Sequence, residues 1–168
     1  MAGMVLMLAA VCALGIPGRT AQDKNKDKVE LDKHLSVHVY VFASDVPAGE
    51  PDAQQTNADR AEAVRDMREA LRHKAGLAIV DDRASADVLV EVVDREARES
   101  PDGGFGGVSV TNLGDKIIRL HVVSGDEDVD IKGIGQGTWG RAAKDGADRV
   151  LKWIARLEQK KKRLGSNL

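Results

Sequence analysis

The chain has 168 residues, of which 42% are hydrophobic and 31% charged, a balance typical of a single folded domain. Its formal net charge of −2 provides no overall positive field to attract nucleic acid. Aromatic residues make up only 3% of the chain, so few rings are available to stack on bases or sugars. Composition therefore argues against nucleic acid as a partner.

The N-terminal segment has the pattern of an export signal. No charged residue precedes Arg19, and residues 5–14 form an apolar run. A run of about ten residues matches the core of a signal peptide, whereas a membrane-spanning helix needs roughly 20. We therefore predict a signal peptide over residues 1–21 and a periplasmic or secreted protein. Cleavage before Ile16 would follow small residues, whereas cleavage after Ala21 would leave Arg19 at an unfavourable position.

Cys12, the only cysteine, raises the alternative of a lipid anchor. Lipid-modified cysteines usually follow Gly, Ala or Ser, but Val11 precedes Cys12, so the residues favour a soluble secreted form with membrane contact at most peripheral. A buried N-terminal helix is the third interpretation. Once the signal is removed, the mature domain would have no disulfide, and its core must hold it together.

The remainder of the chain divides into three parts. Polar residues of mixed charge at 22–34 predict a flexible linker. Residues 35–158 carry the apolar periodicity of a single α/β domain, and residues 159–168 predict a basic disordered tail.

The elements of this domain follow from its periodicity. Alternating side chains predict a strand at residues 35–43, and Thr56 with Asp59 predicts a capping box for a helix that ends at Ala75. The inward stripe of this helix is expected at Ala61, Val64, Met67, Leu71 and Ala75. Apolar runs predict further strands at residues 77–80, 88–94, 116–123 and 129–134. A last helix from about Thr138 is expected to bury Trp139, Ala143, Ala147, Val150, Ile154 and Leu157.

This element order predicts an α+β fold, in which a mixed sheet of about five strands packs both helices on one face. If Val39 and Val41 point toward the helices, the other face presents a set of apolar side chains. The candidate partner-binding residues on that face are Tyr40, Phe42, Leu89, Val93, Ile117 and Val123. Exposed apolar patches mark interaction sites. A glycine-rich loop or a dimer partner covering this face is the structural alternative.

One glycine motif invites a nucleotide-binding interpretation. Gly135, Gly137 and Gly140 form G-x-G-x-x-G between a predicted strand and a predicted helix. A dinucleotide site also needs a following strand that ends in an acidic residue about 20 positions later, and only Glu158 and a basic tail follow here. We therefore favour glycines that ease a tight turn, and we predict no cofactor.

The sequence patterns for a metal site or an acid–base site are as incomplete as the nucleotide-binding motif. Asp126, Asp128 and Asp130 alternate as in a calcium loop, but that loop needs Gly at its sixth position and Glu at its twelfth, where Ile131 and Gly137 stand. A zinc site is conceivable from His34, His38 and His121. The pair Asp81 and Asp82 could serve acid–base chemistry only if a cleft buried one of them. Solvated turns and surface histidines are the favoured interpretation, so we predict no metal site and no catalytic residue.

A basic run, Lys160 to Arg163, ends the last predicted helix. It could contact anionic lipid or peptidoglycan. Cations near a helix C-terminus also complement the helix dipole, and we favour this interpretation, in which the basic run has no binding role.

The segment from Ala70 to Val92 resembles a recurrent stretch of bacterial envelope proteins. Leu71 and Leu77-Ala-Ile-Val80 match a helix end followed by a short strand, and Ala84-Ser-Ala-Asp87 leads into the apolar strand that ends at Val92. The same stretch occurs in the TolB amino-terminal domain, the curli-secretion lipoproteins and the penicillin-binding-protein activator lipoproteins. The resemblance implies a partner-binding module, although the lipid-attachment motif of many of those relatives is missing here.

The sequence therefore predicts an exported envelope protein that acts as a non-catalytic binding or accessory module, with an envelope protein as its partner. The alternative is a small secreted hydrolase that uses carboxylates beside the loop at residues 99–114. A deep pocket with convergent carboxylates would favour the hydrolase, and a flat apolar face would favour the binding module.

Overall fold

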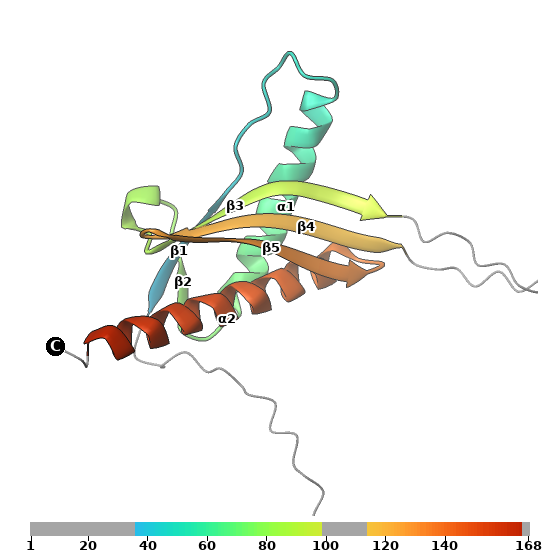
Figure 1. Ribbon diagram of the computed structural model, residues 1–168. Coiled ribbons are helices and arrows are strands. Elements are labelled where there is room, and N and C mark those ends of the chain that lie inside the picture. The colour runs from blue at the N-terminus through green and yellow to red at the C-terminus, as the bar shows by residue number, and fades with distance from the viewer. Residues whose placement is uncertain (1–35, 99–113, 166–168) are drawn as a thin grey trace, which may run out of the picture.

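The computed structural model describes residues 36–98 and 114–165, so the predicted signal peptide and linker lie outside the described residues. Its elements, in chain order, are β1 (Val37–Phe42), α1 (Ala53–Arg72), β2 (Leu77–Ile79), the short 3-10 helix η1 (Arg83–Ser85), β3 (Val88–Arg98), β4 (Asp115–Ser124), β5 (Glu127–Gln136) and α2 (Trp139–Gly165). Figure 1 shows these elements as one mixed sheet with two helices. The predicted α+β fold and its element order are confirmed.

The sheet combines a parallel half and an antiparallel half. Its strand order is β2-β1-β3-β4-β5, and β1 is parallel to both of its neighbours, β2 and β3. β3, β4 and β5 form an antiparallel meander. The register of β3 against β4 shifts between Val92 and Asp94, which marks a β-bulge at Val93.

Both helices pack on the same face of the sheet. A single apolar cluster joins alternate residues of the strands to one side of each helix. Its largest fully buried members are Met67, Leu71, Ile118, Leu120, Val39, Val88, Val90, Val92, Val122 and Val150. We call this side of the sheet the covered face. Its alternating Val, Ile and Leu residues explain the strands, because β-branched side chains suit a pleated, buried surface.

Two glycines let α2 lie directly on β5. A Cβ added at Gly133 would stand 2.3 Å from the carbonyl oxygen of Ala142, and one added at Gly135 would stand 2.3 Å from the amide nitrogen of Ala142. Real Cβ atoms essentially never approach backbone so closely, so only glycine fits at either position.

Side chains of α2 also engage the backbone of β5, which forms one edge of the sheet. The amide of Ile134 donates to Asp145 Oδ2 at 3.0 Å. The guanidinium of Arg141 donates to the carbonyl oxygen of Gln136 at 3.4 Å.

The first helix differs from its predicted bounds. It begins at Ala53, not at Thr56, because the Thr56 amide already bonds to the carbonyl of Asp52. Ala63 is buried in place of Ala61, and Ala75 is exposed beyond the helix end.

The second helix agrees with its predicted start and apolar stripe but continues further. It runs to Gly165, so residues 159–165, expected as part of a disordered tail, are helical. Within the described parts of the chain, no helix is long and apolar enough to cross a membrane.

Candidate partner-binding face

The side of the sheet opposite the covered face, here called the open face, is built from cross-strand rows. In the first row, Tyr40 of β1 lies beside Leu89 of β3, which lies beside Val123 of β4. In the second row, Phe42 lies beside Glu91, His121 and Asp130 in turn. Both α1 and α2 pack against the other side of these strands, so neither helix covers the rows.

Two aromatic rings form the centre of the apolar part of the open face. The rings of Tyr40 and Phe42 stack with centroids 5.6 Å apart and an interplanar angle of 18°. The guanidinium of Arg83, from η1, lies 5.0 Å from the Phe42 centroid, a cation–π contact. With Leu89 and Val123, the two rings make a half-buried group that we call the aromatic cluster.

The second row places a histidine among carboxylates. His121 Nδ1 lies 2.9 Å from Asp130 Oδ1. This hydrogen bond raises the pKa of His121, burial opposes the rise, and the negative charges of Asp130, Asp128 and Glu91 add to it. Glu91 also accepts a hydrogen bond from the Ser44 hydroxyl. The aromatic cluster is thus bordered by acidic groups.

A third row of charges separates the aromatic cluster from the far end of the open face. Arg119 lies 3.0 Å from Glu96 and 3.6 Å from Asp94. Hydrogen bonds from Arg98 and Arg119 lower the pKa of Glu96.

The six predicted apolar residues therefore do not form one patch. Tyr40, Phe42, Leu89 and Val123 lie together, whereas Ile117 pairs with Ile134 beyond the charged row. Val93 lies at the bulge and is 41% exposed. Strand alternation assigns side chains to a face, but their grouping on that face depends on the strand register, which the periodicity does not fix.

The bulge also creates an ion cluster on the covered side that the sequence analysis missed. It turns Arg95 toward the helices, where the side chain is only 7% exposed. The Arg95 guanidinium lies 4.1 Å from the centroid of the Trp139 ring. It also forms an ion pair with Glu62 of α1. Two further carboxylates of α1 lie near it, Asp59 at 3.8 Å and Asp66 at 3.7 Å. No sequence signal marks the bulge, so simple alternation is misleading here.

These contacts bear on the hydrolase alternative. The hydrogen bond and charge of Arg95 lower the pKa of Glu62, as Arg98 and Arg119 do for Glu96. A carboxyl group that acts as a general acid near neutral pH needs a raised pKa. Glu62 and Glu96 are therefore poor candidates for that role. The loop at residues 99–113 lies outside the described residues.

Polar side chains also line a cavity of about 400 Å³ between the start of β1 and the C-terminal half of α2. Its two carboxylates already have partners. Asp87 accepts the His38 amide at 2.8 Å, and Glu158 pairs with Lys161 at 3.2 Å. Both carboxylates of this cavity are thus engaged by neighbouring groups of the fold.

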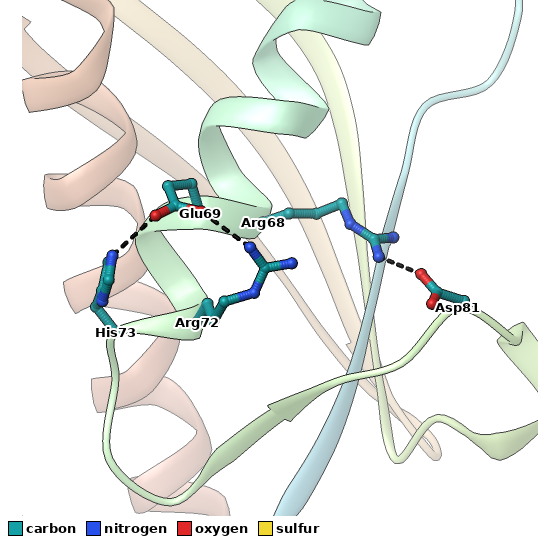
Figure 2. Close-up of polar contacts among 5 residues, drawn as sticks. All are labelled: Arg68, Glu69, Arg72, His73 and Asp81. Atoms are coloured by element: carbon teal, nitrogen blue, oxygen red, sulfur yellow. Dashed lines mark hydrogen bonds and ion pairs between the residues drawn. The ribbon is translucent and has the colours of Figure 1, made fainter.

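The consecutive pair Asp81 and Asp82 has structural contacts. Asp81 forms an ion pair with Arg68, next to the i,i+3 and i,i+4 pairs that Glu69 makes with Arg72 and His73 at the end of α1 (Figure 2). Asp82 accepts the Ala84 amide at 3.1 Å and so caps η1. These contacts tie α1 and η1 to the segment that follows β2.

The glycine motif serves packing and a turn. Gly135 allows close contact with α2, and Gly137 adopts φ 76°, a conformation that favours glycine. A Cβ at Gly140 would meet nothing within 4 Å, so that position has no steric need for glycine. This supports the tight-turn interpretation of the motif over a nucleotide site.

The residues considered as metal ligands from the sequence do not lie together. Asp128 and Asp130 belong to β5 and not to a loop, and Asp130 bonds to His121. His38 lies beside Asp87, on a strand separated from that of His121 by β3, and His34 lies outside the described residues. Among the residues the structure describes, no three His, Cys, Asp or Glu side chains are arranged to hold a metal.

Comparison with known proteins finds likeness in fold only. No family model matches the chain, and a search of curated proteins finds no match. Among solved structures, the N-terminal domain of Thermus thermophilus Protein Y is 10% identical, with a TM-score of 0.34 over 73% of this chain and 99% of that chain. A PelC dodecamer from Paraburkholderia phytofirmans is 13% identical, with a TM-score of 0.37 over 73% and 87%.

A third structure, the uncharacterized lipoprotein B from Nitrosomonas europaea, is 12% identical, with a TM-score of 0.35 over 78% of this chain and 88% of that chain. At such identities the likeness concerns the fold alone, so a function for this protein has to be inferred from its own residues.

Proposed function

We propose that this protein is exported to the cell envelope and binds another protein through the aromatic cluster of its open face, as a non-catalytic accessory module. The observation that carries the proposal is the stacked pair Tyr40 and Phe42, half-buried on a sheet face that neither helix covers. Aromatic side chains are enriched at the centres of protein interfaces, because they bury a large area at low entropic cost.

The surroundings of the cluster define the partner's chemistry. Leu89 and Val123 extend the apolar centre, Arg83 lies against the Phe42 ring, and Glu91, Asp128 and Asp130 border the cluster with negative charge. A matching protein surface would present apolar side chains at its centre and Lys or Arg at its rim. Such rim charges chiefly guide association and orientation, while the apolar centre supplies affinity.

The test compares two changes on the same face. Phe42→Asp places a charge in the aromatic cluster, and Ile134→Asp places the same charge at an exposed position beyond the Arg119 row. Interface aromatics commonly carry 2 kcal/mol or more, which corresponds to about thirtyfold in affinity. We expect Phe42→Asp to abolish capture of a partner from envelope extract, and Ile134→Asp to retain it.

Circular dichroism and thermal unfolding must show that both variants are folded. A folded Phe42→Asp that captures the same partner as wild type would contradict the proposed face. Loss of capture in both variants would also contradict it, because the effect would then not be specific to the cluster.

Export itself has a separate test. Mass spectrometry of the protein from its native host is expected to show a chain that begins between Ile16 and Gln22. An intact Met1 would contradict export by a cleaved signal, and an acyl group on Cys12 would replace the soluble form with a lipid-anchored one.

A further inference from the structure

The C-terminal half of α2 carries a row of cations on the side away from the core. Lys152, Arg156, Lys160 and Arg163 follow one another at spacings of four, four and three residues, so they share one face of the helix. All four are exposed, whereas Val150, Ile154 and Leu157 are buried on the other side. We call these four residues the basic stripe.

The helix α2 ends at one extremity of the molecule (Figure 1). Residues of the basic stripe line a shallow hollow on the surface of α2 near that end. The hollow has a volume of about 310 Å³ and is lined by Arg156, Gln159, Lys160, Arg163 and Leu164. Leu164 is 64% exposed, the most exposed large apolar side chain of the described residues. Positive charge and an exposed apolar side chain thus occur at one place.

Charge is distributed unevenly between this end and the rest of the protein. Residues 152–165 contain six basic residues and one acidic residue, Glu158, whereas the whole chain carries a net charge of −2. Glu127, the first residue of β5, pairs with Lys160 and partly neutralises it. An anionic surface would still attract this end and repel the negatively charged remainder, and would therefore orient the molecule.

We propose that the basic stripe and Leu164 bind anionic phospholipid at a membrane surface, as a peripheral contact independent of the open face. Lys and Arg side chains are attracted to the negative headgroups, and an apolar side chain beside them can enter the boundary of the acyl chains. Leu164 distinguishes this partner from a soluble polyanion, because a polyanion offers nothing apolar for it to contact.

The experiment is co-sedimentation of the purified protein with vesicles of phosphatidylcholine, with or without phosphatidylglycerol. We expect binding only to vesicles that contain phosphatidylglycerol, and weaker binding as salt rises. Each basic residue near an anionic surface contributes about fivefold to partitioning, so Arg156→Gln, Lys160→Gln and Arg163→Gln together are expected to reduce it on the order of 100-fold.

A control variant carries the same change of charge elsewhere. Arg65→Gln, Arg72→Gln and Lys132→Gln replace three exposed cations of α1 and β5, and this variant is expected to bind as wild type does. The N-terminal segment is identical in every variant, so its contribution cancels. Circular dichroism checks that each variant keeps its fold.

Three results would overturn the proposal. One is equal binding to vesicles with and without phosphatidylglycerol. Another is an equal loss in the stripe variant and the control, which would mean that net charge alone matters. The last is full displacement by soluble polyphosphate combined with no effect of Leu164→Ser, which would identify a polyanion site instead of a lipid site. We expect Leu164→Ser to weaken vesicle binding several-fold.

Discussion

The two faces of this sheet come from the same strands, yet their side chains differ in burial and in charge pairing. On the covered face, Val39, Val90 and Ile118 are fully buried in one apolar cluster. On the open face, a half-buried aromatic cluster lies beside charged pairs such as His121 with Asp130 and Arg119 with Glu96. The covered face stabilises the fold through close packing, and the open face leaves partly exposed groups whose arrangement can serve recognition.

The largest expected effect comes from adding one methyl group to the covered face. Gly133→Ala would place a Cβ 2.3 Å from a backbone oxygen of α2, and neither backbone can yield cheaply. We expect a loss of about 4 kcal/mol or more in the free energy of unfolding, measured with urea.

Gly140→Ala is the matched control, because its added Cβ meets nothing within 4 Å and it lies in α2. It is expected to be neutral or to stabilise by up to about 1 kcal/mol. Similar losses at both glycines would show that the contact between α2 and β5 is not as close as described.

A second prediction compares the effect of a Leu→Ala substitution on the covered face with its effect on the open face. Leu71, fully buried in α1, packs on the covered face, whereas Leu89 is half-buried on the open face. Leu71→Ala is expected to cost about 2–5 kcal/mol, because it removes buried apolar area and leaves a cavity. Leu89→Ala is expected to cost about 1 kcal/mol or less, since water can fill the space. Equal costs in urea unfolding would mean that both faces are covered in solution.

The smallest predicted effect is a pH dependence on the open face. The pKa of His121 is raised in the folded protein, chiefly by its hydrogen bond to Asp130. The pair therefore stabilises the fold fully below the unfolded pKa of about 6.5, and this contribution disappears as pH rises through the higher folded pKa. Both side chains are accessible to solvent, so we expect at most about 1 kcal/mol.

The measurement is the difference in unfolding free energy between wild type and His121→Gln across a pH range that brackets the folded and unfolded pKa values of the histidine. That difference is expected to fade toward the alkaline end, and Asp130→Asn is expected to remove most of it. A difference that stays constant with pH would rule out the charged pair as its source.

The sequence was most informative where periodicity alone determines structure. Alternating valines in β1 and the apolar stripe of α2 predicted the element order, the sheet and the covered face, because burial imposes those periods. Periodicity does not report register, so the separation of Ile117 from the aromatic cluster could not be foreseen. The bulge at Val93 reverses the alternation and turns Arg95 inward, and the start of α1 depends on backbone contacts of Asp52 that no side-chain pattern encodes.

The hydrogen bonds that α2 makes to the edge of β5 have a consequence for solubility. A ten-residue edge strand normally offers its free amides and carbonyls to any other extended chain, which is how aggregation by strand addition begins. Here Asp145 occupies the Ile134 amide and Arg141 the Gln136 carbonyl, and α2 lies along the strand. The opposite edge, β2, has only three residues. The contacts with α2 and the shortness of β2 both reduce the backbone that the edges of the sheet offer for strand addition.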